Sequence, residues 1–205
     1  MKALSRVFLV FVAIAAAVAA WMFIQVSGGV RSVEAGAAIG QPLADFKLPD
    51  LEGKEQTLSA HKGKNTVVLI FANQGCPFSI GAEPALFALH EKYKDKGVVF
   101  YAIDSNATNT VEEIKKHVAE KQVPYTVLKD VDNKYADAVG AKVTPETFVV
   151  DKNGNLAYHG APDDRKSPDA AGTTPWLDNA LAALTTGKEV DVKEAKTWGC
   201  GIKRK

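Results

Sequence analysis

The strongest constraint on the fold is an apolar, β-branched run that leads almost directly into a helix. The run is Thr66–Ala72, with the sequence TVVLIFA. A strand buried on both faces of a sheet has this composition, as at the centre of a parallel sheet. Helical spacing begins just after Cys76-Pro77, and proline is tolerated in a first helical turn because its missing N–H is not needed there. We therefore expect a strand–turn–helix unit with Cys76 at its junction.

The rest of the chain alternates between strand-like and helical patterns. Strands are expected at residues 46–48, 56–58, 98–103, 125–128, 147–150 and 156–158, with an Asn-Gly hairpin turn at 151–155. Helices are expected at residues 79–96, from 109 or 110 to 120, at 133–139, and from 173 or 174 to 186. Pro84 should bend the first helix or break its first turn, and Thr173 or Thr174 should cap the last helix. From residue 66 on, the order β-α-β-α-β-α-β-β-α predicts a mixed sheet covered by helices on both faces.

The N-terminus has the pattern of a membrane anchor or an export signal. Lys2 and Arg6 precede the uncharged, mainly apolar segment Val7–Val26. At helical rise such a segment spans about 30 Å, the hydrocarbon thickness of a bilayer, and the positive charges in front place the N-terminus inside. A retained anchor is favoured over a cleaved signal peptide, although residues 33–35 offer small side chains for cleavage. In either case we expect export to the periplasm or the extracellular side, which are oxidising compartments.

The composition, and the spacing of cysteines and histidines, indicate how the chain is divided into segments and which ligands it is not expected to bind. We assign residues 1–27 to the anchor or signal, 28–40 to a linker, 41–190 to one folded domain, and 191–205 to a tail. The net charge of +1 makes no electrostatic case for binding nucleic acid. The two cysteines, Cys76 and Cys200, lack zinc-ligand spacing, and the four histidines are scattered. We therefore expect neither a metal nor a cofactor.

Two motifs carry a resemblance to a known fold. Gly75-Cys76-Pro77-Phe78-Ser79 follows the apolar strand, and Val143-Thr144-Pro145-Glu146-Thr147-Phe148 precedes the hairpin. They stand where thioredoxin-fold proteins have their Cys-x-x-Cys and their cis-proline loop. Over residues 40–190 the chain thus resembles the thioredoxin-like, three-layer α/β/α fold with a mixed central sheet. The segments at 158–164 and 199–203 make it most similar to the branch of alkyl hydroperoxide reductase/thiol-specific antioxidant (AhpC/TSA) proteins, or redoxins.

The resemblance assigns roles to residues around Cys76. It implies that Cys76 is the nucleophile, that the bond before Pro145 is cis, and that the backbone of Thr144 is presented to an extended substrate strand. Pro77 and Ser79 complete the implied substrate-binding residues. Independently of the resemblance, a cysteine at a helix start has a lowered pKa, because the helix dipole and free N–H groups favour the thiolate. The alternative, from residue type alone, is an inert core cysteine.

The chain also departs from the family patterns. Ser79 occupies the position of the second cysteine of Cys-x-x-Cys, so Cys76 has no neighbouring thiol. Leu69 and Asn73 stand where peroxiredoxins carry the proline and threonine of Pro-x-x-x-Thr-x-x-Cys, and no catalytic arginine can be assigned. Cys200 is left open as a resolving cysteine, a structural disulfide partner, an intermolecular partner or an idle thiol. Trp198, two residues before it, is expected to be a packing residue.

Three functions are compatible with these features. The first is an exported thiol oxidoreductase, in which Cys76 attacks a disulfide or an oxidised thiol of a protein substrate and an external thiol reductant restores the enzyme. The second is a thiol peroxidase, in which a small peroxide oxidises Cys76 to a sulfenic acid that condenses with Cys200. The third is a non-catalytic module that binds extended peptides at the Pro145 edge.

Overall fold

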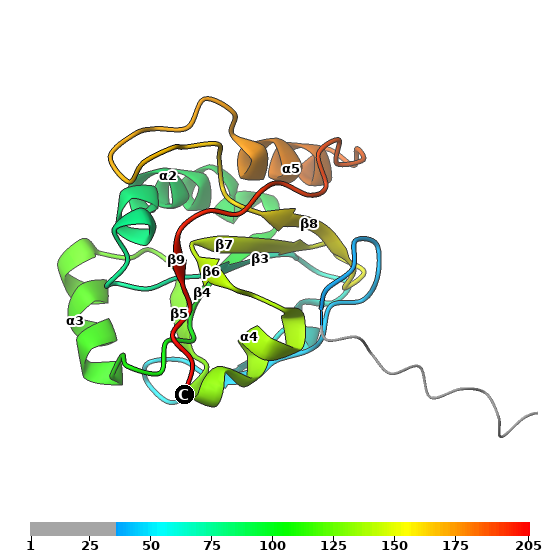
Figure 1. Ribbon diagram of the computed structural model, residues 1–205. Coiled ribbons are helices and arrows are strands. Elements are labelled where there is room, and N and C mark those ends of the chain that lie inside the picture. The colour runs from blue at the N-terminus through cyan, green and yellow to red at the C-terminus, as the bar shows by residue number, and fades with distance from the viewer. Residues whose placement is uncertain (1–35) are drawn as a thin grey trace, which may run out of the picture. The chain divides into compact units, whose positions relative to one another are not determined.

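The computed structural model describes residues 36–205 (Figure 1). The expected anchor or signal segment lies outside these residues. Within the described part of the chain, no helix combines the length and the apolar character needed to cross a bilayer.

A five-stranded mixed sheet forms the centre of the domain, in the order β5-β4-β3-β7-β8. The strands are β3 (Thr66–Phe71), β4 (Val98–Asp104), β5 (Thr126–Lys129), β7 (Glu146–Val150) and β8 (Leu156–Gly160). β4 runs parallel to β3 and to β5, whereas β7 runs antiparallel to β3 and to β8. All six residues of β3 are buried. The apolar run is thus the central strand, as its composition predicts.

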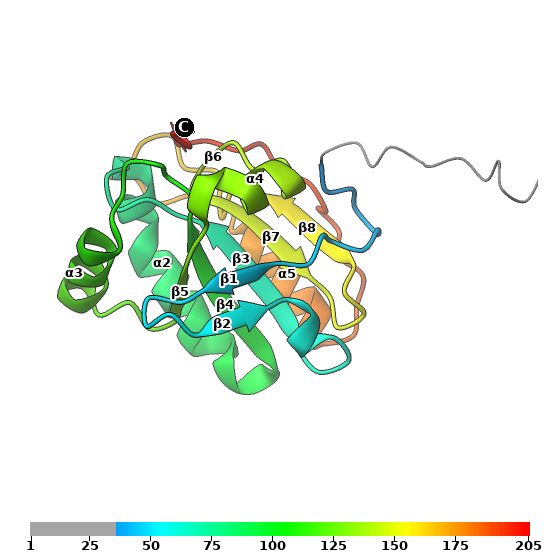
Figure 2. The same ribbon diagram turned by 90° about the horizontal axis from the view of Figure 1, so that it is seen from below.

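Alternate side chains of the sheet feed two separate cores. Val68 and Ile70 of β3 point to the side covered by α2 (Pro77–Tyr93) and α5 (Trp176–Thr185). The intervening residues, Leu69 and Phe71, pack with α4 (Lys134–Val139) and with the hairpin of β1 (Lys47–Pro49) and β2 (Glu55–Thr57). α3 (Val111–Lys121) covers parts of β4 and β5. Figure 2 shows α4 and the hairpin on the near face, with α5 behind the sheet. The three layers and the mixed sheet confirm the expected fold class.

Several local signals were sufficient to place helix ends. Thr110 caps α3 in a capping box: its hydroxyl accepts the amide of Glu113, whose carboxylate accepts the amide of Thr110. Gly140 ends α4 with φ at +77°, a conformation that glycine adopts without a steric cost.

The first long helix begins at Pro77, which lies in the first turn as expected, two residues before the range expected from the apolar spacing, and Pro84 does not break it. The expected cap of the last helix was wrong. Neither Thr173 nor Thr174 caps α5, whose N-cap is Pro175. Instead, both threonines donate backbone and hydroxyl hydrogen bonds to Asp164. A distant carboxylate therefore satisfies groups that the sequence pattern assigned to the helix end.

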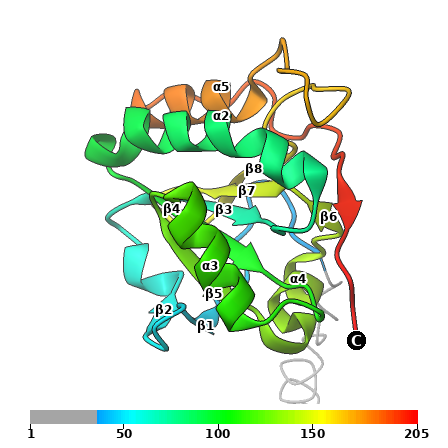
Figure 3. The ribbon, with the colours of Figure 1, turned by 90° about the vertical axis from the view of Figure 1, so that its left-hand side faces the viewer.

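The C-terminal segment is ordered and lies against the domain. β9 (Cys200–Gly201) pairs antiparallel with β6 (Val143–Thr144), with Thr144 opposite Cys200 and Val143 opposite Gly201. Figure 3 shows β9 beside β6, at the end of the sheet where α2 begins. The segment therefore reaches the strand–helix junction that the sequence singles out.

Candidate active site

Cys76 occupies the junction between β3 and α2. It is the N-cap residue of α2, with an extended backbone, and Pro77 takes the first helical position. A four-residue turn, residues 73–76, ends at it, since the Cys76 amide donates to the Asn73 carbonyl at 3.0 Å. The side chain has no exposed surface. A sulfur so placed lies next to the unpaired N–H groups of a helix N-terminus, which stabilise negative charge.

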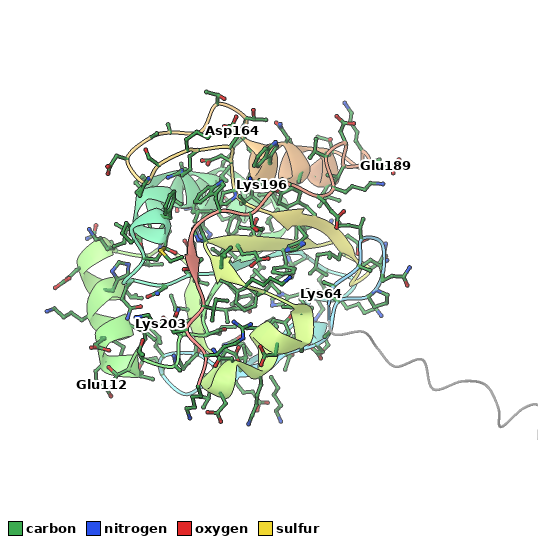
Figure 4. The ribbon with its side chains drawn as sticks, in the orientation of Figure 1. Lys64, Glu112, Asp164, Glu189, Lys196 and Lys203 are labelled. Carbon is green, nitrogen blue, oxygen red and sulfur yellow. A yellow bond between two sulfur atoms is a disulfide. The ribbon has the colours of Figure 1, made fainter. Side chains whose placement is uncertain are left out.

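Cys76 and Cys200 form a disulfide. Their Cα atoms are 5.9 Å apart, although 124 positions separate them in the sequence. This distance is within the usual range for a disulfide. Lys196 and Lys203, labelled in Figure 4, bracket the segment that carries Cys200. Of the alternatives left open for Cys200, the intramolecular bond to Cys76 is the one present.

The loop before β7 meets the same sulfur. The Thr144–Pro145 peptide bond is cis, as the resemblance implied. Thr144 is 1% exposed, and its carbonyl oxygen lies 3.1 Å from the Cys76 Sγ. The backbone of Thr144 therefore faces Cys76 on one side and pairs with β9 on the other.

Ser79, at the position of a second cysteine, has a structural hydrogen bond. It is 4% exposed, and its hydroxyl oxygen accepts the Asn73 amide at 3.3 Å. The Asn73 side chain in turn accepts the Gly75 amide at 2.8 Å and the side-chain amide of Asn109 at 3.0 Å. Ser79 and Asn73 thus hold the turn that presents Cys76, whereas Pro77 is exposed on its rim.

A buried carboxylate anchors the loop that contains Thr144. Glu146 accepts the amides of Lys142 at 2.7 Å and Val143 at 3.0 Å, and a ring N–H of His159 at 2.7 Å. The Glu146 side chain is 3% exposed. Burial alone would raise the pKa of Glu146, but the hydrogen bonds from His159, Lys142 and Val143 outweigh it and hold this pKa below its ordinary value. Glu146 is therefore a charged clamp on the segment that pairs with β9.

We expect Glu146→Gln to destabilise the domain by about 2 kcal/mol near neutral pH, because an amide cannot accept all three donors. The pKa of Glu146 is lower in the folded state than in the unfolded state. The charged carboxylate therefore stabilises the fold fully at pH values above the ordinary carboxyl pKa, and this stabilisation is lost as the pH falls through the pKa of the folded state. The gap between wild type and variant in urea unfolding should thus close on acidification. Glu189→Gln, at an exposed carboxylate, is the control and should change little. A gap that is absent, or independent of pH, would contradict the assignment.

Sequence reasoning missed a cluster that supports the Cys200 segment. Arg165 is 5% exposed, and its guanidinium pairs with the Asp163 carboxylate at 2.7 Å and donates to the carbonyl of Gly81 in α2 at 2.5 Å. The same guanidinium lies 5.2 Å from the ring centroid of Trp198. Trp198 also packs on Phe78, with centroids 5.5 Å apart, and its indole N–H donates to the Asp163 carbonyl at 2.7 Å. Asp163 is a local partner of Arg165, but its other partners lie on α2 and in the tail, so no local pattern marks the whole cluster.

A small cavity lies behind the cysteine turn. Its volume is about 40 Å³, enough for two or three waters. The lining includes Asn73, Ser79, Glu83, His117 and Pro145. A carboxylate–imidazole hydrogen bond at 2.5 Å joins Glu83 to His117. The cavity is too small for a polypeptide, and Cys76 is not among the residues that line it.

Comparison with known proteins identifies the family of this chain. The sequence profile of the AhpC/TSA family matches residues 39–159, more than half of the chain. The chain belongs to the AhpC/TSA family. This match contains Cys76, Thr144 and Pro145 but ends before Cys200.

Relatives of this AhpC/TSA protein fall into two functional groups. The thiol-disulfide oxidoreductase ResA of Bacillus cereus is 31% identical over 128 residues, covering 62% of this chain and 72% of ResA. The chloroplastic peroxiredoxin Q of Oryza sativa subsp. japonica is 29% identical over 139 residues, covering 64% of this chain and 63% of that protein.

Solved structures agree with the fold of this AhpC/TSA protein. A hypothetical protein from Sinorhizobium meliloti 1021 has a TM-score of 0.77 and 31% identity, covering 83% of this chain and 96% of its own. The thioredoxin domain of a thiol-disulfide oxidoreductase from Bacteroides vulgatus has a TM-score of 0.56 and 22% identity, covering 62% and 90%, respectively. The fold is thus thioredoxin-like, and the chain carries a pair of redox cysteines within it.

Proposed function

We propose that this protein is an exported thiol-disulfide oxidoreductase in which Cys76 is the nucleophile and Cys200 is the resolving cysteine. The observation that carries the proposal is the disulfide between a helix N-cap cysteine and a strand paired with the cis-proline loop. A cysteine at a helix start is favoured as a thiolate, and the thiolate is the attacking species in disulfide exchange. The similarity to ResA supports the same reaction class.

The proposed reaction transfers two electrons to a substrate disulfide. In the reduced protein, the Cys76 thiolate attacks one substrate sulfur, and the other substrate sulfur leaves as a thiolate that takes up a proton. Cys200 then loses its proton and attacks the Cys76 Sγ, so the mixed disulfide breaks and the second substrate sulfur leaves and is protonated. The substrate gains two electrons and two protons. Cys76 and Cys200 lose two electrons; one proton comes from Cys200, and the other is the proton that Cys76 released to solvent when it ionised. An external dithiol restores the reduced protein.

Export is the second part of the proposal. Lys2 and Arg6 followed by the apolar segment Val7–Val26 favour insertion with the folded domain on the outer side of the membrane. A disulfide between the two cysteines suits an oxidising compartment. Detection of the domain on the outer side by protease accessibility in intact cells would test this part.

Trapping the mixed disulfide tests the reaction. We expect Cys200→Ser, mixed with a protein disulfide substrate, to accumulate a covalent adduct at Cys76 that intact mass spectrometry detects and a thiol reductant releases, whereas wild type should show the Cys76–Cys200 bond and no adduct. The matched control is Cys76→Ser, which should form no adduct. Accumulation of the Cys76–Cys200 disulfide with peroxide but not with any disulfide would instead favour the peroxidase. If Cys76 reacted with neither peroxide nor disulfides, both enzymatic functions would be excluded, and the non-catalytic peptide-binding module would be the remaining function.

A further inference from the structure

The C-terminal segment adds a strand at the edge where a substrate would bind. Thr144 pairs with Cys200, and Val143 pairs with Gly201, in antiparallel register. Beyond this pair, the Ile202 amide donates to the Lys142 carbonyl at 2.9 Å, and the Lys203 carbonyl accepts the Ala107 amide at 3.0 Å. Main-chain pairing of this kind is how sheet edges recognise extended peptides, with pockets for alternate side chains giving specificity. The segment therefore has the geometry of a bound peptide.

Alternate side chains of the segment enter the domain. Trp198, Cys200 and Ile202 occupy every second position of the segment, and each contacts the domain. Trp198 packs against Phe78 and the guanidinium of Arg165, and its indole N–H donates to the Asp163 carbonyl. Ile202 is 7% exposed and belongs to the core beneath α4. The domain thus provides an aromatic site two residues before the bonded cysteine and an aliphatic site two residues after it.

The residue directly before Cys200 must be small. A Cβ added at Gly199 would lie 2.1 Å from the Thr144 carbonyl oxygen, and the φ of Gly199 is +130°, which favours glycine. A Cβ added at Gly201, on the other side of Cys200, meets nothing within 4 Å. The close approach is therefore confined to one position, and Gly201 provides a matched control in the same strand.

Access to Cys76 connects this edge with an external partner. Cys76 has no exposed surface in the disulfide-bonded protein, and the cavity behind its turn holds only a few waters. The edge that β9 occupies borders this sulfur, because the Thr144 carbonyl oxygen lies 3.1 Å from the Cys76 Sγ and Thr144 pairs with Cys200, so a polypeptide in the place of β9 would reach it. Reduction removes the covalent tie of β9, which leaves its pairing and side-chain contacts to hold it there.

We propose that residues 198–202 are an internal copy of the substrate motif, and that the substrates are polypeptides with an extended segment of the form aromatic–Gly–Cys–any–aliphatic. This inference rests on the proposed function, because it describes the substrate of the same site. The substrate segment takes the place of β9 in the reduced protein, and its cysteine forms the mixed disulfide with Cys76. The return of β9 then brings Cys200 to the Cys76 Sγ and displaces the substrate segment from the edge, so the Cys76–Cys200 bond forms and the reduced substrate leaves in one movement.

Peptides in trans test the motif. The protein is full-length Cys200→Ser, and the probe is a peptide of residues 196–203 whose cysteine carries a small aromatic thiol leaving group. We expect the parent peptide to modify Cys76 about tenfold faster than peptides with Trp198→Ala or Gly199→Ala, since each loses a contact or a fit worth roughly 1.4 kcal/mol. The peptide with Gly201→Ala should react within about twofold of the parent. Equal rates for all four peptides would overturn the proposal.

The complementary test displaces β9 from β6 in the protein itself. Gly199→Ala in the Cys200→Ser background should displace β9 and raise the rate with the parent peptide about tenfold, whereas Gly201→Ala should leave it unchanged within about twofold. Thermal unfolding checks that each variant is folded. A small aromatic disulfide without a peptide separates the two proposals. If it modifies Cys76 while the peptides show no preference, the substrate motif fails alone; if Cys76 stays unmodified by every reagent, the proposed function fails with it.

Discussion

Replacing Cys76 with serine is expected to lower the rate of disulfide reduction by at least about a thousandfold, because a serine hydroxyl is almost entirely protonated near neutral pH and attacks sulfur poorly. The substitution exchanges one buried atom, so the fold should persist. The rate is measured as turnover of a protein disulfide with excess dithiol as the reductant.

Cys200→Ser separates the nucleophile from the resolving cysteine. This variant should reach one adduct per protein rapidly and then turn over slowly, since a free dithiol must replace Cys200 in the second step. If Cys76→Ser retained the wild-type rate, or if Cys200→Ser alone abolished the first step, the roles assigned to the two cysteines would be wrong.

Reducing the Cys76–Cys200 bond is expected to destabilise the domain by about 3–5 kcal/mol, because the bond closes a loop across 124 positions and restricts the unfolded chain. For a domain of this size, the change corresponds to a fall in the unfolding temperature of about 10 °C. Urea and thermal unfolding, with and without a thiol reductant, measure it.

The control for this measurement is the double variant Cys76→Ser/Cys200→Ser, whose stability should not respond to the reductant. Wild type that unfolds at the same urea concentration in both redox states would contradict the prediction. It would mean that the contacts of β9 and Trp198 hold the segment in place without help from the bond.

Short-range signals made much of the fold predictable. The apolar composition of β3 marks a central strand, Thr110 and Glu113 mark the start of α3, and Gly140 marks the end of α4. Each of these features depends on residues within a few positions of one another. The position of Cys76 at a strand–helix junction follows from the same kind of local pattern.

The rest of the site depends on contacts between distant segments. The tail around Cys200 is short and contains two glycines, so neither its strand nor its pairing with Thr144 could be derived from its own residues. Arg165 lies in a loop, and its partners Gly81 and Trp198 are far from it and from each other in the sequence. Asp164 likewise recruits the threonines that were expected to cap α5. Such partners become neighbours only once the sheet has assembled.

The shortness of β6 bears on solubility. An uncovered strand edge offers unpaired N–H and C=O groups to other chains and promotes aggregation. β6 has two residues, Val143 and Thr144, and the next residue, Pro145, has no N–H to donate. When β9 departs, the domain therefore uncovers an edge long enough to pair with one peptide beside Cys76 and too short to template an extended sheet between copies of the protein.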